Sequence, residues 1–148
     1  MTFFILIFLT GISTFGQSVE EARLLLNKAK TKKDSCLYYA AYLNQSTNPV
    51  VKGYGAMMLF LEADNVFNPF SKLHFFNSGK AILDSCIQQH PGLLELRLLR
   101  YAVQNEIPSI LGYDNRNEDK KILLQSIHLI EKKDEYLYKR IKETVYEN

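Results

Sequence analysis

The sequence predicts an all-α fold, and three observations lead to it. Helix-capping signals recur along the chain, most clearly at Asn48-Pro49 and Asn68-Pro69, where an asparagine N-cap precedes a proline at the first helical position. No run of four or more residues alternates apolar and polar convincingly as a strand. The connections between the expected helices are short, which makes neighbouring helices antiparallel hairpins. We therefore expect about six to seven helices arranged as antiparallel hairpins.

Several of the expected helices begin or end at a recognisable capping or turn residue. Ser18 and Glu21 form a capping box ahead of the first helix. Pro91 opens the central helix, and Gly112 suits a left-handed C-cap after a short turn that starts at Pro108. In chain order the expected segments are 20–30, a helix from about residue 34 to 45, 49–67, 69–90, the helix opened by Pro91, 118–133 and 134–147.

The first sixteen residues are expected to be a cleaved signal peptide. Residues 3–9 read FFILIFL, and hydrophobicity then falls quickly. Thr14 and Gly16 are small residues at the −3 and −1 positions of a cut before Gln17. The apolar run is far shorter than the roughly 20 residues that span a bilayer. The alternative is a buried N-terminal helix, because only the α-amino group supplies positive charge there.

Cleavage would leave residues 17–148 as a single helical domain, periplasmic or secreted. No cysteine stands near the cut, so we do not expect a lipid-anchored protein. The net charge is +2 with acids and bases interspersed, unlike the basic stripe of a nucleic-acid binder. Cys36 and Cys86 are the only cysteines. A disulfide between them is chemically permitted outside the cytoplasm, but both lie in apolar helical patterns typical of buried thiols.

Two resemblances concern the middle of the chain. The junction from Cys86 to Arg97, with Pro91 between two apolar helices, resembles one helix-to-helix junction of a tetratricopeptide repeat (TPR). This resemblance implies that the hairpins form a right-handed, TPR-like stack. A longer stretch, 54–121, resembles a family of uncharacterised exported helical proteins of Bacteroidetes. The matching elements are Asn68-Pro69-x-x-Lys72-Leu73, the ELRLLR segment and the IPSILGY turn. The resemblance implies export and a helical fold, and it implies no substrate.

The central helix, PGLLELRLLRYAVQNE, is apolar nearly all round yet carries charges in its middle. Arg97, Arg100 and Gln104 form one polar ridge, and Glu95 is set among leucines. A helix this apolar packs on several sides, so its charges need partners. We expect a structural ion-pair network, with candidate acids Glu62, Asp64, Asp84, Glu118 and Asp119. The alternative is an anion clamp in which Arg97 and Arg100 hold a carboxylate or phosphate ligand.

A second group of residues is a candidate groove. Gly53 and Gly55 lie in one helix, where each glycine costs about 1 kcal/mol relative to alanine. Close helix crossing is one explanation, and a gap that admits a peptide or small ligand is the other. Tyr38 and Tyr42 share a helix face at i, i+4. They suit either the rim of a helical core or a recognition surface.

The sequence contains few motifs that would indicate a catalytic or metal-binding site. The three histidines show no i, i+4 pair that would indicate a helical metal site. SGKA at 78–81 and DNRNED at 114–119 lack the residues of a phosphate loop and of a calcium loop. We expect a non-catalytic, exported helical interaction or scaffold protein of the cell envelope, with no cofactor or metal and with a protein or peptide partner. An enzyme or anion-binding protein that uses Arg97 and Arg100 is the alternative.

Overall fold

The all-α prediction is confirmed. The computed structural model describes residues 17–32 and 35–146, and within them there is no strand. The predicted signal peptide, residues 1–16, lies outside the described residues. The α-helices are α1 (Val19–Thr31), α2 (Cys36–Leu43), α3 (Pro49–Asn65), α4 (Pro69–Gln89), α5 (Leu94–Glu106), α6 (Arg116–Ser126) and α7 (Glu135–Ile141). Short 3-10 helices η2 (Ser109–Leu111) and η3 (Ile127–Leu129) flank α6, and a π-helical turn η4 (Lys142–Tyr146) follows α7.

The predicted N-caps form at three helices. The Ser18 hydroxyl accepts a hydrogen bond from the Glu21 amide at 3.0 Å. The Asn48 and Asn68 side chains each accept from the amide two residues later, both at 2.9 Å. Each cap therefore satisfies a backbone donor that the first turn of its helix leaves without a partner. The proline that follows each asparagine lacks such a donor, which fits the first helical position.

The prediction that Pro91 opens the central helix is wrong by three residues. Residues 90–93 form a tight turn in which the Leu93 amide donates to the His90 carbonyl at 3.1 Å. Helix α5 begins after this turn, at Leu94, and its N-cap, Leu93, supplies no side-chain hydrogen bond. The turn reverses the chain direction between α4 and α5, so Pro91 belongs to the connection.

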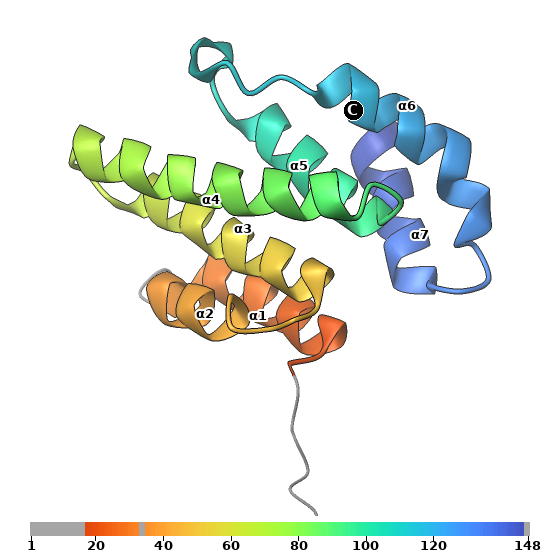
Figure 1. The fold of residues 1–148 in the computed structure, drawn as a ribbon, viewed down its shortest axis with the longest axis horizontal. Helices are drawn as coiled ribbons and strands as arrows, with labels where there is room; N and C mark the ends of the chain where they lie inside the picture. The colour runs from red at the N-terminus through yellow and green to blue at the C-terminus, as the bar shows by residue number, and fades with distance from the viewer. Residues whose placement is uncertain (1–16, 33–34, 147–148) are drawn as a thin grey trace, which may run out of the picture.

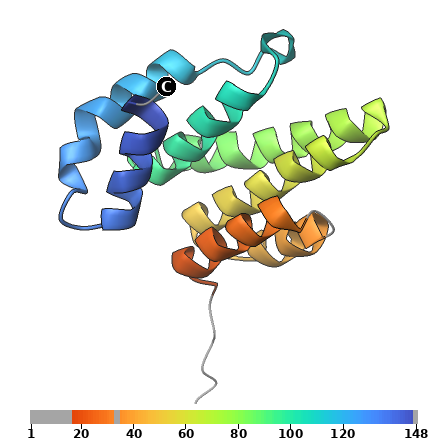
Figure 2. The same cartoon turned by 180° about the vertical axis from the view of Figure 1, so that it is seen from behind.

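The helices pack as neighbouring pairs around two long elements. Helices α3 and α4 run side by side, α1 and α2 cover one side of α3, and α6 packs on α5 (Figure 1). The view from behind shows the same order, with α7 beside α6 (Figure 2). The TPR-like form of this stack stays a prediction.

Helix α5 is apolar all round because it contributes to three separate parts of the core. Leu96 and Leu99 join the core of α1–α4. Leu94, Leu98 and Tyr101 join the core made with α6, α7 and η4. Val103 joins a small aromatic cluster of Ala63, Phe76 and Tyr113. The helix thus links the N-terminal and C-terminal parts of the molecule.

Candidate functional site

The polar ridge of α5 is buried and paired with carboxylates. Arg97 and Arg100 are 7% and 6% exposed, and Asp119 of α6 is completely buried between them. The Asp119 carboxylate accepts from Arg97 Nη1 at 2.9 Å and from Arg100 Nε and Nη2 at 2.7 and 2.8 Å. One buried acid therefore joins both arginines, and the Arg100 contact is bidentate.

Two further acids accept hydrogen bonds from the arginines of the ridge. Asp84 of α4 accepts from Arg100 at 3.2 Å, and Glu118 accepts from Arg97 at 3.4 Å. Arg97 also donates to the carbonyl of Pro91 at 3.0 Å, which fixes the turn before α5. Two of the expected acids, Glu62 and Asp64, form no ion pair within the described part of the chain. The prediction that Glu62 is an acid of this ion-pair network is therefore wrong.

The ridge extends to the loop between α5 and α6. The Tyr113 hydroxyl donates to Asp84 at 2.7 Å. Burial, and then this bond to a carboxylate, raise the pKa of Tyr113 above its ordinary value, so the phenol stays neutral. At the start of α6, the side-chain oxygen of Gln104 accepts a hydrogen bond from the Asn115 backbone amide at 2.9 Å. The whole ridge therefore holds α6 and its preceding loop on α5.

A second network, centred on Arg23 of α1, holds the other charge of α5. Arg23 makes a bidentate pair with Glu95, at 2.8 Å from Nε and 2.7 Å from Nη2, and it contacts Asp134 at 2.6 Å. The hydroxyl of Tyr54 on α3 donates to Glu95 at 2.6 Å. The guanidinium also lies over the ring of Tyr136, at 4.3 Å from the centroid. This network joins α1, α3, α5 and α7.

The pKa shifts in this second network favour the charged pair. Burial alone would lower the pKa of Arg23, but the hydrogen bonds to Glu95 and Asp134 outweigh it and raise that pKa. For Asp134, burial raises the pKa, but the hydrogen bonds from Arg23 and from the Leu137 amide lower it by more, so the net change is a decrease. Burial, and then the neighbouring Glu95, raise the pKa of Tyr54, which stays a neutral donor.

Sequence reasoning missed Arg23, Tyr54 and Asp134 as members of a network. One signal was present: Arg23 lies on the apolar stripe that Ala22 and Leu26 form along α1. A charge on a buried stripe needs a partner, as Glu95 does among its leucines. Nothing local in the sequence pairs residues that are 72 positions apart.

The predicted groove residues do not line one shared groove. A Cβ placed on Gly53 would lie 2.5 Å from Leu96 of α5, whereas one on Gly55 would meet the side chain of Asn44 after α2. The two glycines therefore permit close approach on different faces of α3, as the crossing interpretation requires. Tyr42 donates to Glu21 at 3.2 Å, and Tyr38 is 73% exposed.

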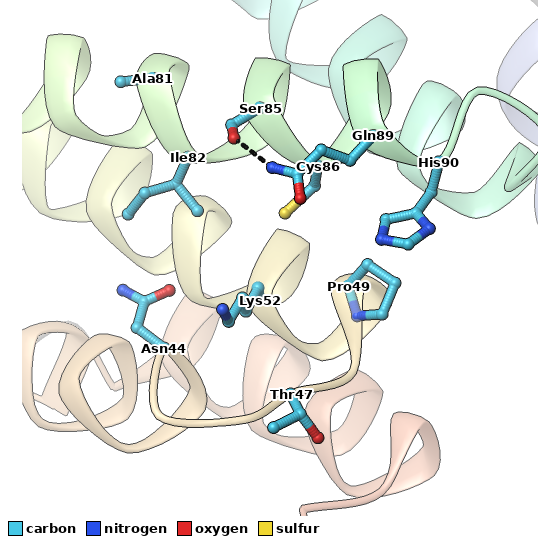
Figure 3. A pocket seen from close by; sticks show the side chains of 10 residues that line it. All are labelled: Asn44, Thr47, Pro49, Lys52, Ala81, Ile82, Ser85, Cys86, Gln89 and His90. Atoms are coloured by element: carbon cyan, nitrogen blue, oxygen red, sulfur yellow. Dashed lines mark hydrogen bonds between the residues drawn. The ribbon is translucent and has the colours of Figure 1, made fainter.

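A cavity of about 450 Å³ lies between the α2–α3 loop, the first turns of α3 and the end of α4. Figure 3 shows Cys86 and His90 pointing from α4 toward α3, with Lys52 and Pro49 opposite them. Burial raises the pKa of the Cys86 thiol, and nearby Lys52 lowers it by less. Cys86 is a free thiol, so it is not bridged to Cys36.

A smaller, mostly apolar cavity of about 290 Å³ lies at the opposite end of the α3–α4 hairpin. The end of α3, the start of α4 and the turn after α5 line it. Its lining is Phe60, Ala63, Asp64, Pro69, Lys72, Leu73, Phe76, Glu106, Ile107, Pro108 and Leu111. Three large apolar side chains close in sequence to lining residues are solvent-exposed. Phe67 and Phe70 lie on either side of Asn68-Pro69, and Ile110 precedes Leu111.

Within residues 17–32 and 35–146, no three His, Cys, Asp or Glu side chains converge as ligands for a metal ion. No helix in that same part of the chain has the length and apolar character needed to cross a membrane.

Comparison with protein families, with curated proteins and with solved structures finds no match to this chain. The resemblance of residues 54–121 to exported helical proteins of Bacteroidetes therefore remains an expectation from the sequence alone.

Proposed function

We propose that this chain is an exported, non-catalytic helical module that binds a segment of another protein. The observation that carries the proposal is the apolar cavity at the joined ends of α3 and α4, with large exposed apolar side chains next to it. Phe67, Phe70 and Ile110 are 101%, 84% and 90% exposed. Contiguous apolar surface is typical of protein-binding sites, whereas single exposed apolar residues are ordinary. We call residues 67–73 and 107–111 the apolar end.

The charges around the apolar end specify the partner. Asp64 and Glu106 line the cavity beside one cation, Lys72. None of the three forms an ion pair within the described residues. An apolar anchor side chain with a basic residue next to it would fill the cavity and pair with an acid of its lining. The proposed partner is therefore a protein segment with an apolar anchor flanked by a basic residue.

The alternative, an anion clamp, is less well supported. The guanidinium groups of Arg97 and Arg100 already donate to Asp119, and Arg100 donates to Asp84 as well. An incoming anion would have to displace a completely buried carboxylate. Breaking a buried ion pair in this way leaves charges without partners and is strongly unfavourable.

Site-specific photo-crosslinking in the native host tests the proposed function. A photoreactive amino acid at position 70 should give one adduct, and the same group at Leu129 should not. Leu129 is also exposed, at 56%, and lies in η3. The connection from α6 to α7 lies on the opposite side of the molecule from the connection between α3 and α4 (Figure 1). The captured protein is then purified and titrated against wild type and the double variant Phe70→Ser/Leu73→Ser.

Binding to the double variant should be at least roughly tenfold weaker, because two apolar contacts are lost. Neutralising the partner's basic residue should also weaken binding. Equal affinity for both forms would overturn the proposal, and so would an adduct of the chain with itself. Export is tested separately by the intact mass of the protein from its host, which should begin at Gln17.

A further inference from the structure

The larger cavity has the polarity of a site for a small anion. Ten residues line it, from the α2–α3 loop, α3 and α4: Asn44, Thr47, Pro49, Lys52, Ala81, Ile82, Ser85, Cys86, Gln89 and His90. Lys52 is the one lysine or arginine among them, and no aspartate or glutamate is present. The cavity volume of about 450 Å³ falls within the range of roughly 300–1,000 Å³ that is usual for small-molecule sites. It lies at the end of the α3–α4 hairpin remote from the apolar end, so the two sites are independent.

Lys52 lacks a compensating charge in the protein. It forms no ion pair in the described part of the chain, although it is half-buried in the cavity wall. The Cys86 thiol beside it does not compensate, because burial raises its pKa and keeps it neutral at pH 7. An ammonium group removed in part from water gains from an anionic partner, and the gain is larger than in bulk solvent.

Other polar side chains line the cavity with the lysine and can bind anionic oxygen. Ser85 contributes a hydroxyl, and His90 contributes an imidazole that points toward α3 (Figure 3). The Gln89 amide donates to Ser85 at 2.8 Å, which fixes both side chains on the wall of α4. A hydroxyl can donate while it accepts, so Ser85 retains a proton for a ligand.

The remaining wall is apolar, which limits the ligand further. Ala81 and Ile82 of α4, with the Pro49 ring and the Cys86 sulfur, form a surface on which a hydrocarbon chain can pack. A bare inorganic anion would leave this surface in contact with water. The chemistry therefore fits a molecule with one anionic end and a short apolar body.

We infer that the cavity between the α2–α3 loop and α4 binds a small organic acid, whose carboxylate pairs with Lys52 while its hydrocarbon part packs on Ala81 and Ile82. The ligand belongs to the class of short-chain carboxylic acids. Its binding is separate from the protein docking proposed at the apolar end, and either can exist without the other.

Calorimetric titration of the purified protein with hexanoate, at constant ionic strength, is the test. Wild type should bind hexanoate saturably and show a matching rise in melting temperature. Lys52→Met keeps the apolar stem of the side chain and removes its charge. It should weaken binding at least roughly tenfold, because a charge-assisted contact is lost. The matched control, Lys121→Met, removes an exposed lysine of α6 that lines neither cavity and should bind as wild type does.

A second readout does not depend on the folding of the Lys52 variant. Bound hexanoate should slow the labelling of Cys86 in wild type by a small thiol reagent, because the thiol lines the cavity. Inorganic phosphate and hexanol separate the contributions of charge and chain, and each should bind at least roughly tenfold more weakly than hexanoate. Absence of saturable hexanoate binding would overturn the inference. The inference would also fail if Lys52→Met bound hexanoate with wild-type affinity, or if phosphate bound as tightly as hexanoate. It would fail too if hexanoate left the rate of Cys86 labelling unchanged.

Discussion

Arg100 of α5 and Asp119 of α6 form a bidentate ion pair, with N–O distances of 2.7 and 2.8 Å, in which the carboxylate is completely buried. The same carboxylate accepts from Arg97, so one acid neutralises two cations. The hydrogen bonds that Arg100 donates to Asp119 and Asp84 outweigh burial and raise the pKa of Arg100. The pair is thus a buried ion-pair connection between two helices.

Removal of this acid should destabilise the protein severely. Asp119→Ala leaves two buried guanidinium groups without their main partner, which typically costs about 3–5 kcal/mol of unfolding free energy. Urea denaturation of the purified variant, without added ligand, measures the loss.

The neighbouring acid provides the control for that prediction. Glu118 contacts Arg97 at 3.4 Å, and its side chain is 57% exposed. Exposed pairs contribute only about 0–1 kcal/mol, so Glu118→Ala should lie close to wild type. A similar loss in both variants would show that the burial of Asp119 is not what matters.

The pair of Arg23 and Glu95 should behave as a coupled unit. Arg23→Met leaves the Glu95 carboxylate buried with only the Tyr54 hydroxyl as a donor, at a cost of about 3–5 kcal/mol. Adding Glu95→Gln removes the stranded charge and should recover part of that loss. The double-mutant cycle, measured by urea denaturation, should give a coupling energy of about 0.5–3 kcal/mol. Strict additivity of the two single changes would contradict the pairing.

Local sequence signals predicted the helices because their causes are local. An asparagine followed by proline fixes a helix start wherever it occurs, and Asn48 and Asn68 both cap as expected. The start of α5 was misplaced because Pro91 serves a turn equally well. That turn depends on the Leu93 amide reaching His90, a contact that composition does not specify.

The charged ridge could be predicted in part. Apolar residues all round α5 imply several packing partners, so its arginines had to be paired, and Asp119 was among the candidate acids. The choice of Asp119 over Glu62 depends on which helices meet, and that is a long-range property. For the same reason the second network and the Lys52 cavity could not be derived from spacing along the chain.

The Arg23 network should make stability depend on acid pH through Asp134. Its pKa is lowered in the folded protein, so the stabilisation is fully present above the unfolded pKa of about 3.9. That stabilisation is lost as pH falls through the lower, folded pKa. Asp134→Asn removes the charge and keeps a residue that caps α7 well.

Urea denaturation between neutral and acid pH tests this dependence. The difference in unfolding free energy between wild type and Asp134→Asn should be constant above about pH 5 and should shrink below about pH 4. A difference that persists unchanged to the lowest pH at which both proteins fold would show that the charge of Asp134 contributes nothing.

Gly53 should resist even the smallest enlargement. Alanine is favoured over glycine in a helix by about 1 kcal/mol. At Gly53, however, the new Cβ would lie 2.5 Å from Leu96 and 3.3 Å from Leu99. Both leucines are buried in the core shared with α5, and overpacking a core typically costs about 1–3 kcal/mol. Gly53→Ala should therefore lower the unfolding free energy despite its better helix propensity.

Gly92→Ala is the matched control for this variant. A Cβ at position 92, in the turn before α5, meets no atom within 4 Å, so this change should leave stability within about 0.5 kcal/mol of wild type. Urea denaturation of both variants separates steric crowding from any general effect of replacing glycine. If Gly53→Ala were as stable as wild type or more so, α3 and α5 would not be in the close contact that explains the glycine. The gap that admits a ligand would then be the better explanation for Gly53.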